Sequence, residues 1–207
     1  MDYTLYLVTD RSLLASGDIY TCVAKAIEGG CTAVQLREKT AVSREFYETA
    51  VRLRAVTARY GVPLIINDRA DIAAAADADG VHLGRNDLPY AAARRVIGDS
   101  KTIGLSASNA AEAVEAAESG ADYIGVGAMF NTATKTDAGL TTFDELKRIR
   151  AAVDIPIVAI GGINAETIRF FENTGIDGVA VVSAIIADPD PFEAARRLKS
   201  LFLNICG

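Results

Sequence analysis

The chain has 207 residues, of which 50% are hydrophobic and 23% are charged, a composition typical of one globular domain. Its net charge of −6 gives no electrostatic support for binding nucleic acid, so an anionic substrate would need a local positive site or a metal ion. The three cysteines lack the spacing of a metal site, which favours reduced thiols and a cytoplasmic location. We see no signal peptide, and no apolar run approaches the roughly 20 residues of a membrane span.

Short apolar runs alternate with helix-like segments along the whole chain. Their aliphatic character is that of parallel strands buried on both faces. The predicted strands are 5–8, 33–36, 63–66, 80–83, 102–105, a sixth within 123–130, 156–160 and 178–182. Helix start and stop residues separate them, namely Asp18 to Gly29, Ser43 to Gly61, 70–76, Pro89 to Gly98, Asn109 to Gly120, a start at Thr142, Asn164 to Gly175, and a start at Asp190.

These alternating units predict a single (β/α)8 TIM barrel domain over residues 1–207. A short motif with a central aspartate recurs before the even-numbered strands, at 78–81, 120–124 and 175–179, and 31–34 is a degenerate copy. A repeat of two units fits a barrel, whose interior layers alternate between odd and even strands. An open doubly wound sheet is the alternative, but no Gly-x-Gly-x-x-Gly turn follows the first strand.

The segment 132–139 carries a polar cluster directly after the sixth apolar run. It contains Thr132, Thr134 and Lys135, and Gly139 ends it. Hydroxyl, ammonium and backbone donors at a strand end suit a phosphate or diphosphate. Taken alone, the segment also fits a polar surface loop.

Polar side chains follow most of the other predicted strands, where a barrel has its active site. They are Asp10, Gln35, Arg37, Glu38, Lys39, Asn67, Asp68, Asp87 and Ser106. Carboxylates beside cations suit a diphosphate bound with magnesium. The alternative is a set of salt bridges and helix caps, which explains any one of these residues better than it explains the whole set.

A second anion site is predicted after the last two strands. Gly161 and Gly162 follow the seventh strand, and Val182 and Ser183 end the eighth, with 183–187 as a short helical turn. This is the common phosphate site of such barrels. Two anion sites on one rim indicate an enzyme with two phosphorylated substrates.

The single histidine, His82, lies inside an apolar strand. A core or supporting role is therefore expected for it. A Ser-His-Asp triad, a zinc site and a histidine base are poorly supported. Lys39 and Lys135 lie past strand ends, which suits anion binding better than a Schiff base.

The motifs together resemble the thiamine-phosphate synthase family. The matching text is 35–39 (QLREK), 66–69 (INDR), 80–84 (GVHLG), 87–89 (DLP), 123–127 (YIGVG), 132–135 (TATK), 137–139 (DAG), 158–163 (VAIGGI) and 179–185 (VAVVSAI). It spans residues 5 to about 191, almost the whole chain. The resemblance implies a barrel transferase that joins 4-amino-2-methyl-5-hydroxymethylpyrimidine diphosphate to 4-methyl-5-(2-phosphooxyethyl)thiazole, which gives thiamine phosphate and diphosphate.

The resemblance also implies roles for single residues. Asp68 and Asp87 match magnesium ligands. The residues that match the pyrimidine and diphosphate site are Gln35, Arg37, Lys39, Asn67 and Lys135, with Ser106 close to the leaving diphosphate. Those that match the thiazole phosphate side are Thr132, Thr134, Gly162, Val182 and Ser183. We expect Lys135, Ser106 and Arg37 to be the catalytic residues.

The family mechanism is dissociative. Diphosphate leaves first, and the thiazole nitrogen then attacks a pyrimidinylmethyl cation, so no side-chain nucleophile or general base is needed. The alternatives are a thiazole tautomerase, which relies on a histidine, and a non-catalytic thiazole-phosphate sensor. The chain departs from the family pattern at several positions, and Arg85 adds a charge near Asp87 whose effect on metal binding the sequence leaves open. The sequence leaves open a homo-oligomer and the form of thiazole used.

Overall fold

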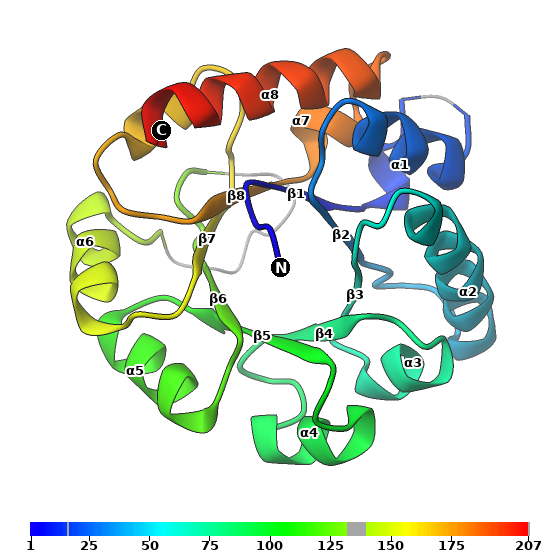
Figure 1. Cartoon of the computed structure of the whole chain (residues 1–207), viewed down its shortest axis with the longest axis horizontal. Coiled ribbons are helices and arrows are strands. Elements are labelled where there is room, and N and C mark those ends of the chain that lie inside the picture. Colours follow the sequence, from blue (N-terminus) through cyan, green and yellow to red (C-terminus); the bar gives the residue numbers. More distant parts are fainter. Residues whose placement is uncertain (16, 132–139, 207) are drawn as a thin grey trace.

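The computed structural model describes residues 1–15, 17–131 and 140–206 and folds them into one closed barrel (Figure 1). The strands run parallel in sequence order, and β8 closes the barrel by pairing with β1. They are β1 (Leu5–Val8), β2 (Ala33–Leu36), β3 (Leu64–Asn67), β4 (Gly80–Leu83), β5 (Thr102–Ala107), β6 (Tyr123–Val126), β7 (Ile157–Ile160) and β8 (Gly178–Val181). The predicted (β/α)8 architecture is confirmed.

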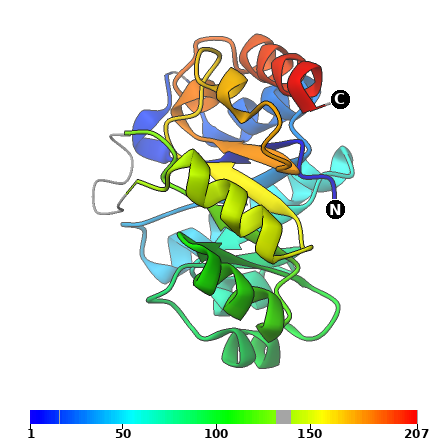
Figure 2. The same cartoon turned by 90° about the vertical axis from the view of Figure 1, so that its left-hand side faces the viewer.

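The helices form a ring outside the strands (Figures 1 and 2). They are α1 (Ile19–Glu28), α2 (Ser43–Arg59), α3 (Ala70–Ala75), α4 (Tyr90–Ile97), α5 (Ala110–Ser119), α6 (Phe143–Ala152), α7 (Ser183–Ile186) and α8 (Pro191–Cys206), with 3-10 helices η1 (Arg11–Leu13) and η2 (Ile168–Phe171). Three predicted caps are confirmed, because the side chains of Asp18, Asn109 and Thr142 each accept backbone N–H groups from the first turn of α1, α5 and α6.

One predicted helix is wrong. The sequence predicts a helix from Asn164 to near Gly175, but the structure has only the four-residue η2 between β7 and β8. Asn164 caps a turn, since its Oδ1 accepts from the N–H groups of Glu166 and Thr167 at 2.8 and 3.1 Å. The helical backbone ends at Glu172, whose ψ of 132° is extended, and Asn173 and Gly175 then adopt left-handed φ angles of 58° and 72°.

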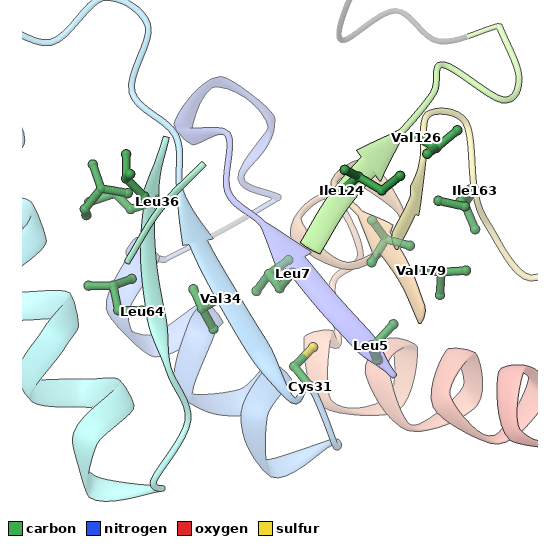
Figure 3. Packing of buried hydrophobic residues seen from close by; sticks show 14 of the residues in the cluster. Leu5, Leu7, Cys31, Val34, Leu36, Leu64, Ile124, Val126, Ile163 and Val179 are labelled. Atoms are coloured by element: carbon green, nitrogen blue, oxygen red, sulfur yellow. The ribbon is translucent and has the colours of Figure 1, made fainter. Parts of the chain in front are cut away.

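Alternate strand residues supply two separate apolar layers. Leu5 and Leu7 of β1 point outward into the layer between strands and helices, where Figure 3 shows Leu7 beside Val34 of β2. The inward-facing residues form a smaller cluster inside the barrel, made of Tyr3, Tyr6, Val8, Ala33, Ile65, Tyr123, Val158 and Ala180. The interior is therefore filled with side chains. A polar side chain deep within it needs a hydrogen-bond partner inside the barrel.

The repeated aspartate motif fixes the amino ends of the strands. Each aspartate precedes an even-numbered strand and accepts a backbone N–H from the preceding odd-numbered strand. The three bonds join Asp79 to Leu64 at 2.8 Å, Asp122 to Ile103 at 2.7 Å, and Asp177 to Ile157 at 2.8 Å. In the degenerate copy the Thr32 Oγ1 accepts from the Leu5 N–H at 3.1 Å, so all four even strands are tied in the same way.

Each of these aspartates also pairs with an arginine from the helix before the odd-numbered strand, namely α2, α4 or α6. The pairs are Arg54 with Asp79 at 3.1 Å, Arg94 with Asp122 at 3.3 Å, and Arg150 with Asp177 at 3.1 Å. The arginines donate to loop carbonyls as well, for example Arg54 Nε to the carbonyl of Asp77 at 3.2 Å. We refer to Thr32, Asp79, Asp122 and Asp177 as the basal clasp. Both chain termini lie at this end of the barrel, opposite the carboxyl ends of the strands (Figure 2).

Candidate functional site

Two carboxylates and an ammonium group meet where β3 and β4 end. Lys39 Nζ lies 2.5 Å from Asp68 Oδ2, and Asp68 lies close enough to Asp87 to raise the pKa of its carboxyl group. Asp68 has a left-handed φ of 66°, and its N–H donates to the carbonyl of His82 at 2.8 Å. Asp87 Oδ2 accepts from the Gly84 N–H at 2.6 Å. The predicted residues Lys39, Asp68 and Asp87 are thus brought together.

The electrostatics of this cluster favour a bound cation. Burial raises the pKa of Asp87, the Gly84 N–H lowers it, and the neighbouring Asp68 carboxylate raises it again, with a raised pKa as the result. A positive charge placed between the two carboxylates would relieve this repulsion. Lys39 supplies one such charge at Asp68.

Arg37 lies on the same rim at the end of β2. Its guanidinium donates to Asp10 Oδ2 at 2.8 Å, and its backbone N–H donates to Thr9 Oγ1 at 3.1 Å. The Asp10 pair fixes the guanidinium while using only part of its five donors. Glu38 faces elsewhere, since it binds Arg11 at 2.9 Å.

A line of hydrogen bonds crosses the barrel interior below the rim. Gln35 Nε2 donates to the Tyr6 hydroxyl at 3.1 Å, and the Tyr6 and Tyr123 hydroxyls are 3.0 Å apart. His82 lies 3.0 Å from Tyr123 through Nδ1 and 3.0 Å from Ser106 Oγ through Nε2. The line therefore connects two predicted substrate residues, Gln35 and Ser106.

The sequence interpretation did not include Tyr6 or Tyr123 among the functional residues. Glycines on the neighbouring strands leave space for this line. A Cβ at Gly104 would overlap the Tyr123 ring, and one at Gly125 would lie 2.9 Å from His82 Cε1. The available signal was the pairing of tyrosines with glycines at inward positions of otherwise aliphatic strands.

The second predicted anion site has the expected backbone. The turn α7 begins at Ser183 directly after Val182, as predicted, and the side chain of Ser183 is exposed. Gly161 and Gly162 have φ angles of 102° and 67°, and a Cβ at Gly162 would lie 2.7 Å from Phe130 Cβ. Only glycine suits such backbone. The first turn of a helix presents N–H groups without intrahelical partners, which can bind a phosphate.

The remaining predicted residues have separate positions. Asn67 is the last residue of β3 and lies opposite His82 in the strand register. Arg85 pairs with Glu112 of α5, so its charge is directed at that carboxylate. Thr132, Thr134 and Lys135 lie outside the described residues.

Two features are absent from the described residues. No group of three or more His, Cys, Asp or Glu side chains among them is placed to hold a metal ion. None of their helices combines the length and apolar character needed to cross a membrane.

Comparison with known proteins gives consistent matches over the whole chain. The family model described as thiamine monophosphate synthase matches residues 5–185. A thiamine-phosphate synthase of Clostridium beijerinckii is 53% identical over 205 residues, which cover 99% of this chain and 98% of that protein. One of Ruminiclostridium cellulolyticum is 54% identical over 204 residues, which cover 99% and 97%.

A solved structure agrees in fold as well as in sequence. The thiamine phosphate pyrophosphorylase from Pyrococcus furiosus superposes with a TM-score of 0.91 at 40% identity, and covers 100% of this chain and 98% of that one. More distant barrels, such as KGPDC from Streptococcus mutans with a TM-score of 0.72 at 15% identity, share the fold alone.

Proposed function

The chain belongs to the thiamine monophosphate synthase family, and we propose that it is a transferase that makes thiamine phosphate. The substrates would be 4-amino-2-methyl-5-hydroxymethylpyrimidine diphosphate and 4-methyl-5-(2-phosphooxyethyl)thiazole. The curated relatives carry the synthase name at about half identity over nearly their full length. The tautomerase and sensor alternatives receive no support from these relatives.

The observation that carries the proposal is the meeting of Lys39, Asp68 and Asp87 at the ends of β2, β3 and β4. Its oxygen donors fit Mg²⁺, which prefers carboxylates and keeps several waters or substrate oxygens. Two protein carboxylates suffice for such an ion. When bound, Mg²⁺ would neutralise charge on the diphosphate.

The side chains around this cluster would act on the leaving group. The bond from the pyrimidine methylene carbon to the diphosphate oxygen breaks, and its electron pair leaves with the diphosphate. Arg37, Lys39 and Ser106 would bind the oxygens that gain charge, while the aspartates hold the metal. Fixed donors aimed at developing charge are the main source of rate in such a site.

The second substrate would bind at the other anion site. The N–H groups at the start of α7, with Gly162, Val182 and Ser183, would hold the thiazole phosphate. The thiazole nitrogen then forms the new carbon–nitrogen bond with its own lone pair. Binding both substrates on one rim supplies the required proximity without a general base. We keep Thr132, Thr134 and Lys135 in the proposed site, with Lys135 on the diphosphate.

The setting of the reaction is also part of the proposal. We propose a cytoplasmic enzyme, which the buried free thiols of Cys22 and Cys31 support. The substrates are small molecules, and the acidic net charge gives no reason to expect nucleic acid. A homo-oligomer remains compatible with the proposal.

A coupling assay tests the proposal. The purified protein receives both substrates, with and without Mg²⁺, and thiamine phosphate is followed by chromatography. We expect product only with Mg²⁺ present. Absence of product in every condition, from folded protein, would refute the proposed transferase activity.

A further inference from the structure

The hydrogen-bonded line inside the barrel joins the two proposed substrate residues Gln35 and Ser106. We propose that this line fixes His82 as the neutral tautomer with its proton on Nε2, and so orients the Ser106 hydroxyl proton toward the substrate diphosphate. We call Tyr6, Tyr123 and His82 the relay. They are positioning residues that act through Ser106, and this inference rests on the proposed function for what Ser106 touches.

The direction of hydrogen-bond donation along this line is set at Gln35. Its amide nitrogen is a donor only, and it donates to the Tyr6 oxygen at 3.1 Å. Tyr6 is about 1% exposed, so its own proton needs an acceptor within the protein. The Tyr123 oxygen at 3.0 Å is that acceptor.

Each later link follows from the one before. Tyr123 is also about 1% exposed, and its proton goes to His82 Nδ1 at 3.0 Å. A neutral imidazole that accepts at Nδ1 carries its proton on Nε2. Nε2 then donates to Ser106 Oγ at 3.0 Å. The serine proton is left to point at another acceptor, and a diphosphate oxygen is acceptor-only.

The opposite direction fits the surroundings less well. It would require Gln35 to accept through Oε1, and would turn the Ser106 proton inward to His82. A diphosphate oxygen would then face the lone pairs of Ser106. Burial raises the pKa values of Tyr6 and Tyr123, so both phenols stay protonated in either direction, and the two ends of the line decide between them.

The residues that surround this line restrict the side chains that form it. A Cβ at Gly104 would overlap the Tyr123 ring, and one at Gly125 would lie 2.9 Å from His82 Cε1. The Tyr3 and Tyr123 rings are in contact, with centroids 4.8 Å apart and planes tilted by 40°, which helps to hold Tyr123 in place. These contacts restrict the phenol and imidazole to the orientation that the line needs.

The tautomer can be measured directly on the unmodified protein. His82 is the only histidine, so nitrogen-15 NMR of labelled protein needs no assignment. At a pH where the ring is neutral, we expect a protonated signal from Nε2 and an unprotonated signal from Nδ1. A proton on Nδ1, or averaged signals from both tautomers, would overturn the inference. Because the measurement needs no substrate, it is independent of the proposed activity.

The role in catalysis is tested by a double-mutant cycle between Tyr123→Phe and Ser106→Ala. Loss of one donor to developing charge costs about 10²-fold in kcat, so we expect a loss of this order for Ser106→Ala and a smaller one, about tenfold, for Tyr123→Phe. If Tyr123 acts through Ser106, the double variant loses no more than Ser106→Ala alone. Losses that multiply would contradict the inference.

Tyr3→Phe is the matched control. It removes the same atom from a ring that packs against Tyr123, but its hydroxyl is not a link in the line. We expect its tautomer signals and kcat to equal those of the wild type. A loss as large as that of Tyr123→Phe would show that the effect is general packing and would overturn the assignment.

Discussion

At the amino end of the barrel, three aspartates each accept a backbone N–H of the preceding strand and pair with an arginine. At the carboxyl end, Asp68 and Asp87 face each other beside one lysine. The first arrangement satisfies every carboxylate with donors from the fold itself. The second leaves two carboxylates in mutual repulsion.

This difference separates residues that hold the barrel from residues that serve a ligand. In a barrel of this kind, stability is concentrated at the amino end and chemistry at the carboxyl end. A charge cluster that costs stability is retained where function requires it. Substitutions at the carboxyl end should therefore lower turnover, whereas substitutions at the amino end should lower stability.

The largest expected effect is on turnover at the carboxyl end. Asp68→Ala removes a proposed metal ligand and the partner of Lys39, so we expect kcat to fall by about 10³-fold or more. Asp79→Asn in the basal clasp is the control and should keep kcat within a factor of about two below its melting temperature. Both are measured in the coupling assay. Near-normal turnover of Asp68→Ala would refute the proposed diphosphate site.

The next effect is on stability at the amino end. Asp79→Ala leaves the buried N–H of Leu64 without its acceptor and removes the partner of Arg54. Charge-assisted hydrogen bonds of this kind contribute about 2 kcal/mol, which corresponds to about 4–8 °C in melting temperature for a chain of this length. Thermal unfolding followed by circular dichroism measures it.

A surface carboxylate provides the control for that change. Glu193 pairs with Arg196 at 2.6 Å, but both side chains are more than half exposed. Such pairs contribute about 0–1 kcal/mol, so Glu193→Ala should barely shift the melting temperature. Equal shifts in melting temperature for Asp79→Ala and Glu193→Ala would mean that the basal clasp stabilises the fold no more than a surface ion pair does.

A smaller effect is expected at the fourth member of the basal clasp. Thr32 accepts from the Leu5 N–H with a neutral hydroxyl, and Thr32→Val removes that acceptor at nearly equal volume. A neutral hydrogen bond contributes about 1 kcal/mol, so the melting temperature should fall by about 2–4 °C, less than for Asp79→Ala. A fall equal to that of Asp79→Ala would mean that charge adds nothing to the basal clasp.

Most of this arrangement could be predicted from the sequence. Short, nearly continuous apolar runs and capping residues such as Asp18 and Asn109 act locally, so the sequence correctly predicts eight strands and most helices. The aspartate repeat was recognised, although its bonds to the preceding strands were not. The segment after β7 was misread because Asn164 caps a turn as readily as a helix.

The polar line inside the barrel could not be predicted in the same way. Tyr6, His82 and Tyr123 lie far apart in sequence and meet only when the barrel closes. Read along a strand, a tyrosine or histidine within an apolar run looks like ordinary core. The residues on the rim were easier to predict from the sequence, since every strand of a parallel barrel ends on the same side.

The smallest effect has the opposite sign and lies at the carboxyl end. The pKa of Asp87 is raised in the folded protein above its ordinary value of 3.8, mainly by burial and also by Asp68. The folded state therefore holds this proton to higher pH than the unfolded state does, and stability falls as pH rises through that interval. Above it the whole cost remains, so Asp87→Asn should melt slightly higher than the wild type near neutral pH.

Two further measurements distinguish this cost from a packing effect. The difference in melting temperature should disappear once the pH is lowered below the ordinary carboxyl value, because Asp87 is then neutral in both states. Adding Mg²⁺ should raise the melting temperature of the wild type but not that of Asp87→Asn, since a ligand stabilises only the state that binds it. A variant that melts lower than the wild type at neutral pH would mean that Asp87 holds the fold as Asp79 does. The contrast between the two ends of the barrel would then fail at this residue.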